Sequence, residues 1–480
     1  MPGSQGVLGT GDFGVLRGRD QYPGATKDWR MRRSSNGQVS DVGAWLALTV
    51  MVATMLYAII DRQVFGLVAA GMSTALHLSN TQLGLIQGLG FAFLTLIGAY
   101  PIAWFADRYD RRWVLAACIL CWAMGTAACG LAAGFSTLFI ASAAVAVSEA
   151  GIAPIFMSML PELFRGQARV TATMVYYIAV SLSTASGLFV VGAMIAGIDA
   201  LKPLPALLGG LEDWRLAFLA AAAPFPIFIA LIFALPIRRV PDAAARVKPT
   251  AAPIAPFLAA NLKSVLLTFT GMTFFALGVT SILAWTPVSL TRIFGLDAAH
   301  VGMVLGAVIA VASIAGVAVA NFVMRYLQRR IGYRSAPRVV WVSLIASIPL
   351  ICLIPIATAP WQVFACVGVQ VFVSTVAGAS SVTLLQDLAP PAVRARIMAL
   401  RAMTNGPAVG LGIAGSAFLG DLIDAGPRSL FWGGLCISVP AWIACIVLMR
   451  LAEKPFETTA QHSTGMSSPL DVAAPAENVA

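Results

Sequence analysis

The sequence predicts an all-α integral membrane protein with about twelve membrane-spanning helices in two similar six-helix lobes. The first reason is composition. Hydrophobic residues make up 59% of the 480 residues and charged residues 11%, whereas a soluble domain has about 25% charged residues. The second reason is the number of apolar segments, and the third is the sorting of positive charge between the loops.

The apolar segments follow one another with only short polar breaks. They lie roughly at 42–73, 82–105, 112–133, 136–160, 170–197, 214–237, 264–291, 301–327, 338–358, 361–386, 398–422 and 429–451. A helix needs about 20 residues to cross the hydrocarbon core of a bilayer. So many spans argue against an enzyme held by one anchor. No nucleotide-binding loop, metal cluster or nucleophilic triad is recognisable, so we expect a non-enzyme without cofactor or metal.

Positive charge is sorted unevenly between the loops. With the N-terminus in the cytoplasm, about 26 of the 31 Lys and Arg fall on the inner side and about four outside. The net charge of +10 therefore reflects membrane topology rather than a nucleic-acid partner. We expect a monomer in the cell (inner) membrane, surrounded by lipid bilayer, with both termini cytoplasmic.

Composition also divides the chain into domains. Residues 1–41 lack an apolar core and are predicted to be a disordered basic cytoplasmic arm, and residues 452–480 a disordered cytoplasmic tail. Residues 238–263 are basic and punctuated by prolines, which predicts a cytoplasmic linker. This linker separates an N-terminal lobe, 42–237, from a C-terminal lobe of nearly equal length, 264–451.

The loop after the second apolar segment reads Ala103-Trp-Phe-Ala-Asp-Arg-Tyr-Asp-Arg-Arg112, with five charges in six residues. Such charge density marks a tight turn at a membrane surface. The loop resembles the signature of the major facilitator superfamily, about G-x-L-A-D-R-x-G-R-R, with Ala103 and Asp110 in place of the two glycines. An echo at 321–330 fits a two-lobed transporter. The alternative is a short cytoplasmic loop with stop-transfer arginines, although its acidic residue would serve no topological purpose.

The resemblance implies a conformational gate that locks the outward-facing state. Asp107 is expected to face the N-terminal end of helix 11, where the helix dipole favours an anion. Arg111 or Arg112 is expected to pair with Glu162. The residues of this predicted gate are Asp107, Arg108, Arg111, Arg112 and Glu162.

Three charged residues lie near the middle of apolar segments: Asp61 and Arg62 in the first, and Glu149 in the fourth. A lone charge at the bilayer centre costs at least about 2.5–3.5 kcal/mol. Removing a carboxyl group from water favours its protonated form, and a nearby arginine favours the ionised form. We therefore predict Asp61 and Glu149 as proton-coupling residues, with Arg62 as a candidate partner of Glu149. The alternative is a buried ion pair that only fixes helix packing.

These charges narrow the resemblance to the Spinster-like branch. Asp61-Arg62, Leu78-Ser-Asn-Thr-Gln-Leu-Gly-Leu-Ile-Gln-Gly88, Ser148-Glu-Ala-Gly-Ile-Ala-Pro154 and Gln386-Asp-Leu-Ala-Pro-Pro-Ala-Val-Arg-Ala-Arg396 carry it. The branch implies proton-linked movement of lysolipids or sphingoid phosphates in its animal members. One departure is Ser142, which stands seven residues before Glu149, where the family usually carries an arginine. Arg62 is left as the membrane-embedded cation.

The substrate site is predicted around Arg62. Tyr57 and Phe65 share the helix face of Asp61, while ordinary helix packing remains an alternative for each aromatic residue. The predicted substrate-binding residues are Arg62, Tyr57, Phe65, Ser142, Tyr176 and Trp285, with Gln87, Tyr177, Gln370 and Asn405 as further candidates.

Together these patterns predict a secondary active transporter that works by alternating access. It would move a small organic or amphiphilic, lysolipid-like substrate together with protons. Three alternatives stay open: an uncoupled facilitator, an organic-anion symporter (since an Asp-Arg pair in helix 1 also occurs there), and a membrane sensor or scaffold without transport.

Overall fold

The computed structural model describes residues 41–203, 205, 209–234 and 254–465, and within these ranges every regular element is a helix. Ten stretches are long and apolar enough to span a membrane, and one of them, Ala298–Ile356, contains two long helices. The shorter apolar stretch Ser186–Ala200 belongs to a further helix. This architecture agrees with the predicted twelve spans.

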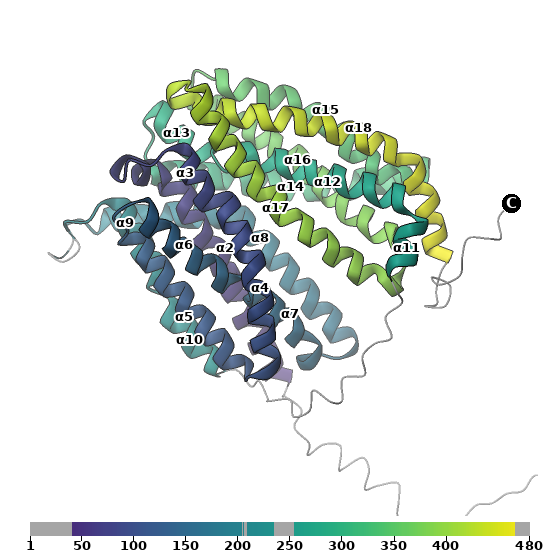
Figure 1. The fold of residues 1–480 in the computed structure, drawn as a ribbon, viewed down its shortest axis with the longest axis horizontal. Coiled ribbons are helices and arrows are strands. Elements are labelled where there is room, and N and C mark those ends of the chain that lie inside the picture. Colours follow the sequence, from purple (N-terminus) through teal and green to yellow (C-terminus); the bar gives the residue numbers. More distant parts are fainter. Residues whose placement is uncertain (1–40, 204, 206–208, 235–253, 466–480) are drawn as a thin grey trace, which may run out of the picture.

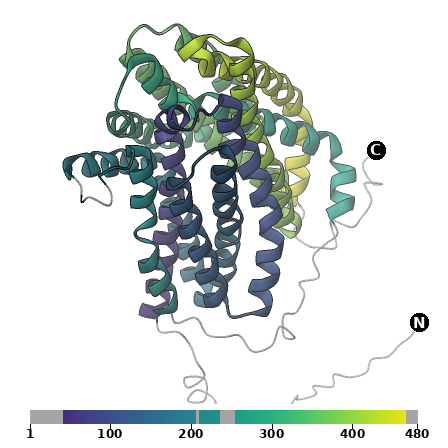
Figure 2. The ribbon, with the colours of Figure 1, turned by 60° about the vertical axis from the view of Figure 1, so that its left-hand side comes forward.

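The chain forms two helical bundles that lie side by side, the first purple to blue and the second green to yellow in Figure 1. In Figure 2 the helices of the first bundle stand nearly upright beside one another. The first lobe contains α2 (Asp41–Ala75), α3 (Asn80–Gly84), η1 (Leu85–Leu89), α4 (Gly90–Arg108), α5 (Arg111–Gly130), α6 (Phe135–Ala150), α7 (Ile152–Leu163), α8 (Gly166–Ala200), α9 (Asp213–Ala222) and α10 (Phe225–Ala234).

The second lobe follows the residues that join the bundles. Its elements are α11 (Ile254–Ala260), α12 (Leu262–Leu283), α13 (Thr286–Phe294), α14 (Ala298–Ile331), η3 (Gly332–Arg334), α15 (Ser335–Leu353), η4 (Ile354–Ile356), α16 (Pro360–Leu388), α17 (Pro391–Ile423), η5 (Gly426–Arg428) and α18 (Ser429–Gly465).

Several predicted spans are interrupted helices. The second span contains η1, a π-helical turn between α3 and α4. The fourth breaks at Gly151, where a Cβ atom would lie 2.0 Å from Ile102 Cγ2, so only glycine lets α4 approach this break. The seventh changes direction before α13, which has a proline in its first turn. Such irregular backbone is tolerated at membrane depth where it lines a cavity or is buried in protein.

We name the two ends of the helical bundle by the predicted topology. The outer end has the turns at 76–79, 295–297 and 424–428, and the opposite end is the cytoplasmic end.

One continuous apolar core crosses both lobes and includes Leu67 and Leu83 of the first lobe with Leu305 of the second. A smaller core lies within the first lobe around Trp122 and Phe156.

Small residues bring the lobes into contact. A Cβ atom at Gly88 would lie 2.7 Å from the carbonyl oxygen of Gly410, and one at Gly302 would lie 2.7 Å from Gly192 Cα. The pairs η1–α17 and α8–α14 therefore pack backbone to backbone, as small residues allow in membrane proteins.

Two predicted boundaries need correction. The C-terminal tail was expected from residue 452, but α18 continues to Gly465. Its last turns are held because Phe456 and Ala460 are buried and Glu457 Oε2 lies 2.6 Å from Arg334 Nη2. The predicted linker also contains α11, whose Phe257 is buried. The predicted arm at 1–40, the linker residues 238–253 and the tail at 466–480 lie outside the described residues.

Candidate functional site: a cavity between the lobes

A cavity of about 1000 Å³ lies between the two lobes, and both contribute to its wall. The first lobe supplies its charged groups, Asp61, Arg62 and Glu149, with the amides of Gln63 and Gln87. The second lobe supplies a wall of α12, α14 and α16 that is mostly apolar. Its members include Phe275, Val279, Leu283, Ile309, Ile314, Val317, Val371, Ala379 and Val382.

Arg62 projects from α2 into this cavity. Its guanidinium carbon lies 4.1 Å from the centre of the Phe91 ring, and Phe91 also lines the cavity. A cation over an aromatic face gains roughly 0.5–2 kcal/mol depending on desolvation. The ring therefore orients a charged side chain that has no carboxylate within ion-pair distance among the described residues.

Asp61 points from the same helix toward α5. It is 5% exposed, and its Oδ2 accepts hydrogen bonds from Trp122 Nε1 at 2.7 Å and from Thr126 Oγ1 at 3.1 Å. Among the described residues, Oδ1 is buried and has no hydrogen-bond partner. A buried acceptor left in this state costs free energy, so one oxygen of this carboxyl group remains available for a proton or for water.

Glu149 lies in the last turn of α6, next to the break at Gly151. Its carbonyl oxygen accepts the hydrogen bond from the Gly151 N–H, and the residue lines the cavity. The charge of Arg62 acts on Glu149 through space, and Glu149 and Asp61 act on each other as like charges. Among the described residues Arg62 forms no ion pair within 4.0 Å, so its predicted partnership with Glu149 is an interaction through space, while its guanidinium lies over the Phe91 ring.

The second lobe adds a few neutral polar groups to its apolar wall. Gln370 of α16 is 3% exposed and donates from Nε2 to Ser374 Oγ at 3.0 Å. Gly378, one turn further along α16, also lines the cavity, and a Cβ atom there would meet nothing within 4 Å. This wall therefore offers room and mostly apolar surface. Its polar side chains are neutral and belong to three helices: Thr280 of α12, Ser313 of α14, and Gln370, Ser374 and Thr375 of α16.

Of the predicted substrate-binding residues, Arg62 and Phe65 line the cavity, together with the candidates Gln87 and Gln370. The structure places the other four elsewhere. The Tyr57 hydroxyl donates to the Ala221 carbonyl, and Trp285 Nε1 donates to Ser416 Oγ. Ser142 and Tyr176 are buried within the first lobe. Helix-face arguments identify the neighbours of Asp61, but they do not tell which neighbour faces the cavity and which faces the lobe interior.

The charged loop at the cytoplasmic end joins α4 to α5. Arg111 Nη1 pairs with Glu162 Oε2 at 2.8 Å, so the expected contact with the end of α7 is present. Asp110 Oδ1 accepts from the Arg112 N–H at 3.0 Å, and this side chain caps α5. Asp110, which stands where the superfamily signature has a glycine, therefore has a structural role as the N-terminal cap of α5. Asp107 and Arg108 are exposed, and Arg108 lies over the Trp104 ring at 3.8 Å.

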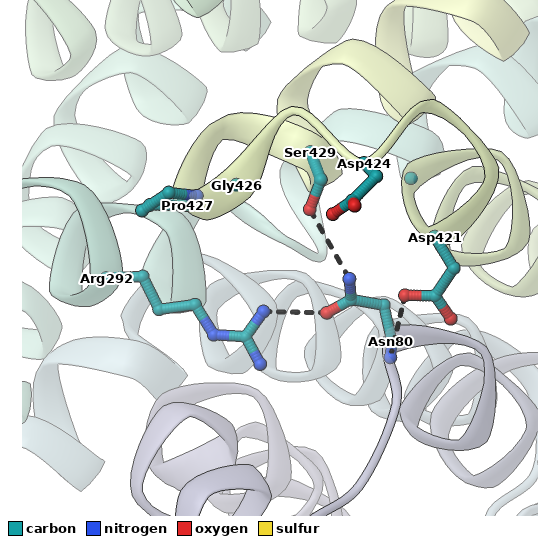
Figure 3. Close-up of a pocket in the computed structure, with 8 residues that line it drawn as sticks. Asn80, Arg292, Asp421, Asp424, Gly426, Pro427 and Ser429 are labelled. Atoms are coloured by element: carbon teal, nitrogen blue, oxygen red, sulfur yellow. Dashed lines mark hydrogen bonds between the residues drawn. The ribbon is translucent and has the colours of Figure 1, made fainter.

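At the outer end, six hydrogen bonds join the lobes around a second, smaller pocket of about 370 Å³. Figure 3 shows Asn80 of the first lobe between Arg292, Asp421 and Ser429 of the second. Arg292 donates to Asn80 Oδ1 at 2.6 Å and to Ser73 Oγ at 2.7 Å. The lobes are therefore fastened together at this end.

Sequence reasoning missed two groups of residues. Trp122 and Thr126 are two donors one helical turn apart, a spacing that could have identified them as partners of a buried acid. Arg292 could have been found because it is an exception to the charge sorting. The other outer cations are also held: Lys202 by Asp199 and Asp213, Arg215 by Glu212, and Arg428 by the carbonyls of Pro355 and Ala357. The hydrogen bonds of Lys202 to Asp199 and Asp213 raise its pKa.

Comparisons with known proteins identify the family. The family model of the Major Facilitator Superfamily matches residues 50–413. The chain belongs to this superfamily. It is 24% identical to an MFS-type efflux pump of Mycolicibacterium smegmatis over 80% of this chain and 85% of that protein. It is also 22% identical to protein spinster of Drosophila melanogaster over 65% of this chain, although the match spans only 51% of the fly protein.

Solved structures agree with this assignment. A bacterial homolog of the human lysosomal transporter Spinster, in an inward-facing and unoccupied conformation, superposes with a TM-score of 0.69 at 19% identity. That match covers 90% of this chain and 99% of the homolog. A D-xylose-proton symporter superposes with a TM-score of 0.62 at 13% identity, over 84% of this chain and 97% of the symporter. The predicted Spinster-like fold is confirmed, and the chain described here is a multi-pass membrane transporter.

Proposed function

We propose that this transporter moves an amphiphilic substrate by alternating access, coupled to protons through Asp61 and Glu149. The observation that carries the proposal is the division of the cavity wall. The charged lining residues and two of the three amides lie on the first lobe, and most of the lining of the second lobe is apolar. A substrate with a polar head and an apolar tail matches both walls at once, because apolar area must be removed from water and polar groups must stay hydrogen-bonded.

The polar head would bind at Arg62. Its guanidinium is held by the Phe91 ring and offers several N–H donors to an anionic group. Gln87 Nε2 is buried without a partner among the described residues, so a bound head group could also satisfy this donor. The tail would lie along the second lobe, whose wall contains Ile314, Val317 and Val382.

Protons would be exchanged at the two acids of the first lobe. Asp61 keeps one oxygen without a hydrogen-bond partner among the described residues, and Glu149 lines the cavity. Arrival or departure of an anionic head at Arg62 changes the charge felt by Glu149. Substrate and proton then influence each other's binding through the same cation, which is reciprocal coupling between two sites.

In the alternating-access cycle, the conformation described here would be the inward-facing one. The lobes are fastened at the outer end by hydrogen bonds between Arg292 and Asn80 and between Asp421 and Thr81. The opposite state would be locked by the loop at Asp107, as the family resemblance implies. In both states of the cycle, the two termini would lie in the cytoplasm and the protein would span the inner membrane of the cell.

The test is flux in proteoliposomes with and without an imposed pH gradient. A thermal-shift screen of single-chain amphiphiles with anionic, zwitterionic and neutral heads selects the transported probe. Wild type should accumulate the probe when the gradient is imposed. Glu149→Gln and Asp61→Asn should lose this accumulation by about tenfold or more, while exchange of probe down its own gradient persists.

Glu453→Gln is the matched control, because Glu453 pairs with Arg338 inside the second lobe and lies away from the cavity. Full response of both acid variants to the gradient would contradict proton coupling and leave an uncoupled facilitator. Absence of flux for every probe would favour a sensor or scaffold. Preference for small anions without a tail would favour an organic-anion symporter.

A further inference from the structure

At the outer end, Asp421 of α17 caps a helix of the opposite lobe. Its carboxylate accepts hydrogen bonds from the Asn80 N–H at 3.2 Å, from the Thr81 N–H at 2.7 Å and from Thr81 Oγ1 at 2.6 Å. Asn80 and Thr81 form the first turn of α3, whose free N–H groups carry partial positive charge. Asp421 is therefore an N-terminal cap supplied across the lobe interface.

This cap acts beside the normal local one. Ser79 Oγ accepts from the Gln82 N–H at 3.1 Å, which leaves the two preceding N–H groups of the turn for Asp421. Arg292 completes the junction, since it donates to Asn80 Oδ1 and its charge interacts with Asp421. Figure 3 shows Asn80 between these two side chains.

The helix that receives this cap runs antiparallel to the helix that supplies it. A Cβ atom at Gly84 would touch Ala417 and Ala414, one at Gly88 would touch Ile413 and Gly410, and one at Gly410 would touch Ala92. A step of four residues toward the C-terminus of the second span therefore corresponds to a step of about four residues toward the N-terminus of α17. The register is fixed by these contacts.

The same register links Asp107 to the other end of α17. Asp107 lies 23 residues after Gly84, and 23 residues before Ala414 and Ala417 are Pro391 and Arg394. Pro391 begins α17, so Asp107 would lie opposite the first turn of that helix if the two helices closed against each other beyond their contacts at Ala92 and Gly410. Each helix has an aspartate near its C-terminal end, and in that closed arrangement each aspartate would meet the N-terminal turn of the other helix.

We propose that Asp421 and Asp107 are reciprocal caps of one antiparallel helix pair, a positioning role for Asp421 in the transport cycle that rests on the alternating access proposed above. Asp421 holds the outer end closed in the conformation described here. Asp107 caps α17 when the cytoplasmic end closes. The helix pair then exchanges one capped N-terminus for the other, so each state retains one charge-assisted cap.

The experiment measures distances between spin labels on the full chain in lipid nanodiscs, with the seven native cysteines replaced. One pair, Ala133→Cys with Ala425→Cys, reports on the outer end. A second pair, Gln167→Cys with Gln328→Cys, reports on the cytoplasmic end. Asp421→Asn should raise the ratio of outer-open to outer-closed molecules about 5- to 30-fold, because it weakens charge-assisted caps.

Asp424→Asn is the matched control. It removes the same charge from the same pocket, and its left-handed backbone conformation, with φ 46°, is one that asparagine tolerates. Its ratio should stay within about twofold of wild type, since surface substitutions away from such contacts have small effects. An unchanged ratio in Asp421→Asn, or an equal shift in Asp424→Asn, would overturn the proposal that Asp421 holds the outer end closed, a role that we call the latch.

The double variant Asp107→Asn/Asp421→Asn separates a reciprocal cap from a merely structural role. Reciprocal caps predict that the ratio returns toward wild type, whereas structural damage predicts no return. If Asp421→Asn does not fold, Thr81→Val, which removes one donor to Asp421, should shift the ratio in the same direction by a smaller factor, and no shift would contradict the latch. The distances require neither substrate nor pH gradient, so loss of proton coupling leaves this test intact. If wild type and every variant show one and the same distance at each end, the molecule has no second state and alternating access itself is contradicted.

Discussion

The two lobes treat their buried charges in opposite ways. In the second lobe, Glu453 accepts hydrogen bonds from two nitrogens of Arg338 and from Trp341 Nε1, and buried Arg401 donates to one carbonyl and two side chains. In the described part of the first lobe, Asp61 leaves one oxygen without a hydrogen-bond partner, and Arg62 lies over an aromatic ring with no carboxylate at ion-pair distance. A buried charged group whose hydrogen bonds are all formed is typical of a structural role. A buried charged group that still lacks a hydrogen-bond partner is typical of a site that binds a ligand or a proton.

The largest expected effect comes from removing the cation of the first lobe. Arg62→Ala should lower transport of anionic amphiphiles about 10- to 100-fold, because a hydrogen bond to a charged group contributes about 1.5–3 kcal/mol. Amphiphiles with neutral heads should lose much less. Initial rates in proteoliposomes measure both. Arg62→Lys keeps the charge but not the planar group over Phe91, so its transport of anionic amphiphiles should lie between that of wild type and that of Arg62→Ala. Equal losses for both head groups would remove Arg62 as the anchor.

Tryptophan donors offer a matched comparison between lobes. Trp122→Phe removes the donor to a carboxylate, and Trp285→Phe removes the donor to the neutral acceptors Ser416 and Ile413. Trp122→Phe should lower the free energy of unfolding by about 1–3 kcal/mol and Trp285→Phe by about 0.5–1.5 kcal/mol beyond their shared loss of ring volume. Equilibrium denaturation in detergent compares the two. Indistinguishable losses would show that the Asp61 contact has no special strength.

The wall of the second lobe is tested by adding volume to it. Gly378→Leu projects into open cavity space and should lower transport of long-chain amphiphiles about tenfold, since it removes the room their tails occupy. Short-chain analogues should be carried normally, and Gly378→Ala should have a smaller effect. Helix propensity alone should make both variants slightly more stable. Chain-length profiles measure the change, and an equal loss at all lengths would argue against a tail on this wall.

The smallest effect is expected for the satisfied charge of the second lobe. Glu453→Gln should lower the free energy of unfolding by about 1 kcal/mol, because it weakens charge-assisted bonds to Arg338, whose side chain is 37% exposed and screened by solvent. Proton-driven transport should remain within about twofold of wild type, since the residue is outside the cavity. Thermal unfolding and flux, measured on the same preparation, test both parts. A selective loss of coupling would erase the contrast between the lobes.

Much of the fold follows from the sequence because hydrophobic length and loop charge are local properties. The spans and the cavity position of Arg62 could be predicted in this way. The pairing of Arg111 or Arg112 with Glu162 was expected from the family resemblance, and the structure forms it with Arg111. Which face of each helix meets the cavity could not, because packing between helices decides it. Trp285 and Tyr176 were therefore expected at the cavity but are buried in the lobes.

The outer junction was also beyond local reasoning. Asp421 and Asn80 are far apart in the chain, and both lie at the ends of apolar segments, where polar residues are ordinary. The outer cations Lys202, Arg215, Arg292 and Arg428 were exceptions to the charge sorting, but this exception did not identify their partners. Interactions that depend on the approach of two lobes leave little trace in the sequence of either one.

The π-helical turn at Leu85–Leu89 has a consequence for how the second span should be drawn. An α-helical wheel advances about 100° per residue, and a π turn fits an additional residue into one turn. Residues before and after η1 therefore belong to two wheels that are out of phase. A substitution scan from Asn80 to Arg108 would show a break in its periodicity at this turn, and conclusions drawn from one half of the span about orientation do not transfer to the other.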